Sequence, residues 1–159
     1  MSSVPILFLD FDGVLHPDPD PDQWPERGPC FTCLPVLEDA LRGLDCHIVI
    51  TSGWRSLNSL PELIAPLGEL GPRVIGVTSY LSHLPPKWNK GRAVRQAEVL
   101  RWRETNGQQD TPFLVLDDWA DGFEPAWPAL YLVDGKTGLR PEDCKPIRVC
   151  LSRLQRGEE

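Results

Sequence analysis

Short apolar runs, separated by polar and proline-containing stretches, recur along the chain. They lie at residues 6–9, 46–50, 74–77, 113–116 and 129–133. A short, continuous apolar run is typical of a strand that is buried on both faces, as in a parallel sheet. The pattern therefore predicts five buried strands.

Helical patterns occupy the first two connections between these runs. A helix is predicted over about 34–43, where leucines recur at helical spacing: Leu34, Leu37, Leu41 and Leu44. Ser59 and Glu62 have the spacing of a capping box. They predict a second helix, which is short because Pro66 soon interrupts it.

Two further helices are predicted in the second half of the chain. Asn89 is a good N-cap for a helix that runs to about Glu104, with an inner face made of Ala93, Ala97 and Leu100. The tail from 141 to 155 contains the last helix, whose inward positions are predicted to be Ile147, Leu151 and Leu154.

The alternation of strands and helices predicts an α/β fold. It favours a Rossmann-like three-layer sandwich, in which a mainly parallel sheet carries helices on both faces. The chain has 159 residues, enough for one core, and no linker or repeat is evident, so residues 1–159 are predicted to form a single domain. In such sheets, ligands bind beyond the carboxyl ends of the strands.

The end of the first predicted strand carries two carboxylates. Asp10 and Asp12 follow the run 6–9, and Gly13 permits a sharp turn after them. In an extended chain, alternation puts both side chains on one side, about 6–7 Å apart, where like charges repel. A bound cation or a proton would relieve that repulsion. The alternative is a surface loop with two solvated acids.

Polar residues also follow the second and fourth predicted strands: Thr51 with Ser52, and Asp117 with Asp118. Lys90 falls on the first turn of the helix predicted from Asn89. A cation there opposes the helix dipole unless an anion occupies the helix end. The alternative for Lys90 is a solvated surface lysine.

These residues, in this order, resemble the motifs of the haloacid dehalogenase-like (HAD) hydrolase superfamily. The superfamily pattern is Asp-x-Asp, then Thr or Ser, then Lys, then an acidic pair, and the likeness spans about residues 10–121. Residues 50–55, together with Asp117 and Asp118, are also similar to phosphatase-type domains found in some RNA repair proteins. The resemblance implies the predicted fold without a cap domain.

The resemblance implies a role in phosphoryl transfer for each motif. Asp10 would attack phosphorus and form an aspartyl-phosphate. Asp12 would protonate the leaving oxygen and later activate water. The phosphoryl oxygens would be bound by Thr51, Ser52 and Lys90. Members of the superfamily that remove halide need no acid at the position of Asp12. The presence of Asp12 therefore favours phosphatase over dehalogenase chemistry.

The resemblance also implies Mg²⁺, which prefers oxygen ligands and keeps several waters. Its ligands would be Asp10, Asp12 through its backbone carbonyl, and Asp117 or Asp118. The spacing between motifs leaves only residues 15–30, a segment rich in proline and aspartate, to cover Asp10. The site is therefore expected to be open, and open sites in this family often serve bulky or macromolecular phosphates.

Three tryptophans lie close to motif residues in sequence: Trp54, Trp88 and Trp119. They could form an aromatic rim that stacks a base of the substrate. The alternative is that they pack the loops. Arg55 could likewise bind phosphate or form a salt bridge.

Composition narrows the function classes. A net charge of −7 argues against a broad nucleic-acid or membrane footprint. An odd number of cysteines without a secretion signal predicts free thiols and a cytoplasmic location, although Cys30 and Cys33 have the spacing of a redox pair or half a zinc site. No obligate protein partner is evident.

The sequence therefore predicts a Mg²⁺-dependent phosphatase for a phosphorylated substrate, such as a nucleotide or a nucleic-acid end. Two alternatives stay open on the same fold. One is a non-catalytic module that binds a phosphorylated ligand, and the other is a phosphotransferase.

Overall fold

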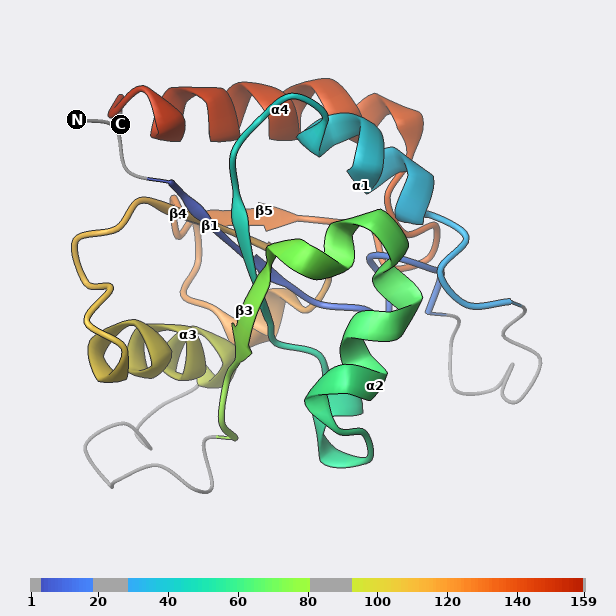
Figure 1. Cartoon of the computed structure of the whole chain (residues 1–159), viewed down its shortest axis with the longest axis horizontal. Coiled ribbons are helices and arrows are strands. Elements are labelled where there is room, and N and C mark those ends of the chain that lie inside the picture. Colours follow the sequence, from blue (N-terminus) through green and yellow to red (C-terminus); the bar gives the residue numbers. More distant parts are fainter. Residues whose placement is uncertain (1–3, 19–28, 81–92, 159) are drawn as a thin grey trace.

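The computed structural model describes residues 4–18, 29–80 and 93–158 (Figure 1). It contains one sheet of five parallel strands in the order β3-β2-β1-β4-β5. The strands are β1 Ile6–Leu9, β2 His47–Ile50, β3 Val74–Val77, β4 Phe113–Asp117 and β5 Leu130–Leu132. All five predicted strands are confirmed, with ends shifted by one residue at most.

Helices cover both faces of this sheet, as predicted. The α-helices are α1 Leu34–Leu41, α2 Leu60–Ile64, α3 Val94–Thr105 and α4 Pro141–Gln155. Segments of 3₁₀ helix are η2 Gly53–Ser56, η3 Ala65–Arg73 and η5 Ala120–Gly122. Figure 1 shows α1 and α4 on one face of the sheet and α3 on the other.

Alternate residues of the central strand build two separate cores. Leu7 and Leu9 pack with α1, α2 and α4, through residues such as Leu37, Leu63 and Ile147. Ile6 and Phe8 point to the other face, where they pack with Val99 of α3 and with Phe123. Both faces of β1 are therefore buried, which explains why its sequence is a continuous apolar run.

The capping box and the inward face of the last helix match the predictions. Ser59 accepts a hydrogen bond from the Glu62 amide, and the Glu62 side chain accepts one from the Ser59 amide. In α4, Ile147 and Leu151 are buried and Leu154 packs against the same core. None of the helices in the described ranges is long and apolar enough to cross a membrane.

Helix α3 departs from the prediction in its start and its inner face. It begins at Val94, with Ala93 as N-cap, rather than near Asn89. Its buried residues are Gln96, Glu98 and Val99, whereas the predicted inner residues Ala97 and Leu100 are only half-buried. The difference arises because two polar side chains of α3 have partners inside the protein, so the apolar pattern does not mark the inner face.

Candidate active site

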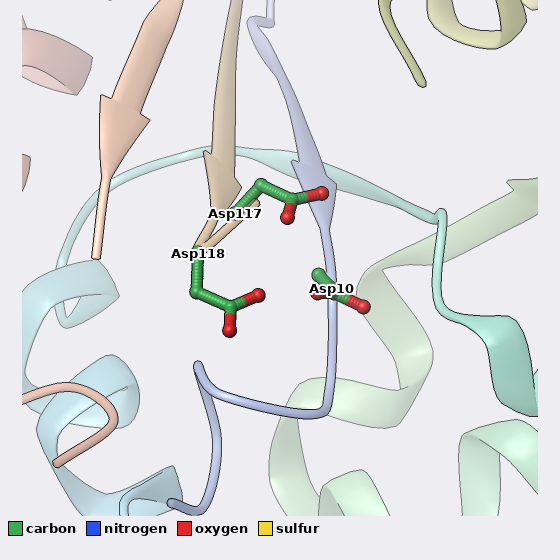
Figure 2. Close-up of side chains that lie close together, drawn as sticks. All are labelled: Asp10, Asp117 and Asp118. Carbon is green, nitrogen blue, oxygen red and sulfur yellow. The ribbon is translucent and has the colours of Figure 1, made fainter. Parts of the chain in front are cut away.

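Three carboxylates meet at the carboxyl edge of the sheet (Figure 2). Asp10 directly follows β1, Asp117 ends β4, and Asp118 comes next. Because β1 and β4 are parallel neighbours with Leu9 paired to Leu116, Asp10 and Asp117 lie side by side. One carboxylate oxygen from each of the three residues lies within 4.8 Å of the others. This convergence confirms the predicted meeting of the first and fourth strand ends.

Two glycines make room for the carboxylate of Asp118. A Cβ atom on Gly13 would lie 2.0 Å from Asp118 Oδ2, and one on Gly135 would lie 2.3 Å from the same oxygen. Gly13 also has a φ of +78°, which side chains rarely tolerate. The glycine of the Asp-x-Asp-Gly motif therefore serves both the turn and the approach of the carboxylate that follows β4.

Burial and mutual repulsion oppose full ionisation of this group. Burial, followed by the charge of Asp117, raises the pKa of Asp10 well above its ordinary value. Burial raises the pKa of Asp117, and burial with the charge of Asp117 raises the pKa of Asp118 to about 6. Converging carboxylate oxygens are the donor set that Mg²⁺ prefers, and a divalent cation would relieve the repulsion. The residues present therefore fit such an ion.

Arg95 supplies a protein cation to the same group. Its Nη1 atom donates to Asp117 Oδ2 at 3.1 Å and lies 3.5 Å from Asp10 Oδ1. Burial acts to lower the pKa of Arg95, but the charges of Asp10 and Asp117 outweigh burial and raise it. The sequence predicts Lys90 as the cation of this site and does not indicate Arg95. Lys90 lies outside the described residues.

Arg95 is in turn linked to a second buried arginine. Glu98 lies 3.5 Å from Nε of Arg95, and both of its oxygens accept from Nη2 of Arg55 at 2.9 and 3.0 Å. Arg55 also donates to the Thr51 carbonyl at 3.0 Å. The salt-bridge alternative for Arg55 is therefore the observed one. The spacing of Arg95 and Glu98, three apart on a helix, is the sequence signal that could have shown this network.

Thr51 and Ser52 follow β2, and only the hydroxyl of Ser52 forms a hydrogen bond among the described residues. Thr51 lies beside Asp10, since its amide donates to the Leu9 carbonyl at 2.9 Å. Its Oγ1 is buried and has no hydrogen-bond partner among the described residues. Ser52 Oγ instead accepts from the Trp54 amide and caps η2. An unpaired buried hydroxyl is costly, so Thr51 is the better candidate for binding a ligand.

The carboxylate of Asp12 is not one of the converging three. Its Oδ1 accepts from His16 Nε2 at 2.7 Å and from Trp54 Nε1 at 3.0 Å. The prediction that Asp10 and Asp12 share one side assumed an extended chain. The chain instead turns here, because the amides of Val14 and Leu15 both donate to the Phe11 carbonyl. The backbone carbonyl of Asp12 stays a predicted metal ligand.

The three tryptophans near the motifs have different surroundings. Trp54 packs edge-on against Phe11 and Phe31, at ring-centroid distances of 5.7 and 5.3 Å, so it belongs to the loop packing. Trp119 is 44% exposed, and the Arg95 guanidinium lies 5.8 Å from its ring. Trp88 and the segment 19–28 of the predicted flap lie outside the described residues.

The cysteines show no bridge. All five are free, as predicted, with Cys30 exposed and Cys33 buried. Cys33 Sγ donates to the Thr137 carbonyl at 3.5 Å. The spacing of Cys30 and Cys33 therefore does not form a disulfide here.

A parallel α/β sandwich with this acidic carboxyl edge has the fold and site arrangement of HAD-like hydrolases. Residues 6–144 match the family model described as the HAD domain in Swiss Army Knife RNA repair proteins, and the chain belongs to that family. The resemblance drawn from the sequence is thus confirmed, and it places the protein in a hydrolase family of phosphatase type. Neither the curated proteins nor the solved structures gave a significant match.

Replacing Arg95 with methionine is expected to destabilise the metal-free protein by about 3–5 kcal/mol, because the buried carboxylates lose their cation. Arg95→Lys should lose less, since it keeps the charge. Urea unfolding of both variants in chelator measures the difference.

Arg42→Met provides the matched control for this substitution. Arg42 pairs with Asp39 at 2.8 Å, but both side chains are exposed. Its loss should leave the unfolding midpoint unchanged. Equal midpoints for Arg95→Met and the wild type would contradict the role of Arg95 as the internal cation of this site.

Proposed function

We propose that this protein is a Mg²⁺-dependent phosphatase that hydrolyses a phosphate monoester through an aspartyl-phosphate on Asp10. The observation that carries the proposal is the meeting of three carboxylates at the sheet edge where Thr51 also lies, with its buried Oγ1 unpaired among the described residues. The carboxylates suit a cation, and the unpaired hydroxyl suits a phosphoryl oxygen. Both features belong together in a phosphoryl-transfer site.

Asp10 is the proposed nucleophile because it is buried at the end of β1, next to Arg95. Its Oδ1 accepts the Phe11 amide at 2.9 Å, which fixes the orientation of the carboxylate. A nucleophile must be ionised, yet the pKa of Asp10 is raised in the metal-free protein. Mg²⁺ held by Asp10, Asp117 and Asp118, with the Asp12 carbonyl, would favour the ionised form and offset charge on the phosphoryl group.

Several other residues have supporting roles in the proposal. Thr51 and Arg95 would bind the phosphoryl oxygens, with Lys90 as a further candidate. Asp12 would give a proton to the leaving oxygen and then take one from the attacking water. Ser52 would hold the loop after β2, since its hydroxyl caps η2.

We further propose a nucleotide or a nucleic-acid end as the substrate. Trp119 follows Asp118 directly and offers an exposed ring at the edge of the site. The matching family is named for RNA repair proteins, which favours a nucleic-acid substrate. A net charge of −7 disfavours contact with a long stretch of phosphates, so recognition of a terminal phosphate and its base is the better fit.

Replacing Trp119 with alanine tests this function and its substrate class together. Stacking is worth about 1–3 kcal/mol per base, so kcat/KM on a 3′- or 5′-phosphorylated oligonucleotide should fall about 5- to 150-fold. Trp119→Phe keeps a ring and should lose less. Hydrolysis of a small alkyl phosphate should barely change in either variant.

Wild-type protein that releases no phosphate from any of these esters in Mg²⁺ would refute the phosphatase proposal. Equal losses on the oligonucleotide and the alkyl phosphate would refute only the stacking role of Trp119. Transfer of phosphate to an added alcohol in place of water would instead identify a phosphotransferase.

A further inference from the structure

We propose that His16 and Trp54 are positioning residues that fix the carboxylate of Asp12 for proton transfer; this inference rests on the proposed function. His16 Nε2 lies 2.7 Å and Trp54 Nε1 lies 3.0 Å from the same oxygen, Asp12 Oδ1. The two donors come from different parts of the chain, the turn after β1 and the segment η2 after β2. They converge on the one motif carboxylate that does not join the acidic group.

The hydrogen bonds of His16 determine which ring nitrogen carries the proton. The Phe31 amide lies 3.1 Å from His16 Nδ1, and a backbone amide can only donate. Nδ1 therefore accepts, so the ring proton is on Nε2 and points at Asp12. The imidazole is thus held as a donor to the carboxylate by its own second hydrogen bond, the usual way in which a protein selects a histidine tautomer.

The surroundings hold the His16 ring in place. His16 is 1% exposed and packs against the rings of Phe31 and Trp54, at centroid distances of 5.4 and 5.8 Å. Its carbonyl accepts from the Gly13 amide at 2.9 Å, which closes the turn around Asp12. Phe31 adopts a φ of +62°, an uncommon conformation for a residue with a side chain. The amide that donates to His16 therefore belongs to a residue whose backbone conformation carries a cost.

The convergence on one oxygen has a chemical consequence. A carboxylate oxygen has two lone pairs, and two N–H donors occupy both of them on Oδ1. A proton that Asp12 delivers must therefore be carried by Oδ2. The two donors also fix the plane of the carboxylate, whose side chain is 30% exposed. General acid catalysis depends first on such geometry, so loss of the donors should impair proton transfer and spare other steps.

Two substitutions of His16 separate this role from simple packing. In glutamine, the amide nitrogen is as many bonds from Cβ as Nε2 of histidine, so His16→Gln can still donate to Asp12. In asparagine, the amide oxygen is as many bonds from Cβ as Nδ1 of histidine. His16→Asn can therefore accept from the Phe31 amide but cannot reach Asp12. Trp54→Phe keeps the aromatic packing and removes only the N–H donor.

The readout is kcat/KM on two esters, an alkyl phosphate with a poor leaving group and 4-nitrophenyl phosphate with a good one. The parameter kcat/KM reports on the steps up to release of the alcohol. In those steps, only the ester with the poor leaving group needs a proton. We expect His16→Asn to lower kcat/KM on the alkyl phosphate about 10- to 100-fold, and on 4-nitrophenyl phosphate less than about 3-fold. His16→Gln should recover most of the loss, and Trp54→Phe should show the same selectivity with a smaller effect.

Equal losses on both esters, or no difference between His16→Gln and His16→Asn, would overturn the positioning role and leave the phosphatase proposal standing. Wild-type protein that is inactive on both esters would overturn both. Circular dichroism checks the fold of each variant. If His16→Asn does not fold, Trp54→Phe decides, because equal losses on the two esters in that variant would overturn the inference.

Discussion

Asp10→Asn is expected to lower phosphatase activity at least about 10⁴-fold, because an amide cannot replace the attacking carboxylate. The fold should be retained. Asparagine has the shape of a protonated aspartic acid, and the raised pKa of Asp10 indicates that the charged form is the unfavourable one in the metal-free protein. The unfolding midpoint of the variant in chelator should therefore equal or exceed that of the wild type.

Two measurements separate the nucleophile from a merely structural residue. After an acid quench during turnover, mass spectrometry should find a phosphoryl group on Asp10 in the wild type and none in the variant. Asp39→Asn, which changes an exposed carboxylate on α1, is the matched control and should keep full activity. Wild-type rates in a folded Asp10→Asn protein would reject the assignment.

Much of this fold could be predicted because buried parallel strands carry a strong signal. The run Ile6–Leu9 is apolar on both faces, and both faces are covered by helices. Once the strands are parallel, residues such as Asp10 and Asp117 must lie at the same edge of the sheet. That edge could be predicted without knowledge of side-chain contacts, whereas the pairing of β1 with β4 comes from the structure.

Helix α3 shows where this reasoning stops. Its inner face includes Gln96 and Glu98, which are buried because they bond to the Glu124 amide and to Arg55. Both partners are far away in sequence, so no local pattern reveals them. The predicted helix start near Asn89 puts Lys90 on the first turn, whereas the observed start at Val94 puts Arg95 there. The local signal for Arg95 is its three-residue spacing from Glu98, and the structure adds the long-range pairing of Glu98 with Arg55.

The surroundings of Asp12 were hidden for a similar reason. The Asp-x-Asp motif reads as extended, but a turn that ends in a hydrogen bond to the His16 carbonyl redirects the chain. His16 then meets Phe31 and Trp54, which approach from separate connections. The aromatic cluster of Phe11, His16, Phe31 and Trp54 has no periodicity, so it could not be predicted from one sequence.

Removal of the metal is expected to abolish activity and to reveal the repulsion within the acidic group. The pKa of Asp118 rises from 3.8 to about 6 on folding, chiefly through burial and then through the charge of Asp117. Between these values, the folded protein binds more protons than the unfolded chain. Asp118 therefore favours the folded, metal-free protein most at low pH, and this stabilising contribution is lost as the pH rises through about 6.

The size of this effect is set by the shift of Asp118. A rise from 3.8 to about 6 corresponds to at most about 3 kcal/mol, and because Asp118 is only partly buried, solvent screening reduces the expected effect to about 1–2 kcal/mol. At pH 7.5 in chelator, Asp118→Asn should thus be more stable than the wild type by about that amount. At pH 4 the two proteins should differ little.

Mg²⁺ should make the wild type more stable than Asp118→Asn at pH 7.5. Such a reversal distinguishes a metal site from a cluster of acids. Saturating Mg²⁺ should raise the thermal unfolding midpoint of the wild type at pH 7.5, because the ion binds only the folded protein. It should have little effect at pH 4, where protons occupy the carboxylates, or on Asp118→Asn. Asp110→Asn changes an exposed acid at the opposite end of β4. It is the control and should respond like the wild type.

Full activity in chelator, together with an unfolding midpoint that does not change with Mg²⁺ at pH 7.5, would show that Asp10, Asp117 and Asp118 do not hold a metal. Arg95 would then be the cation on which the chemistry of this edge depends.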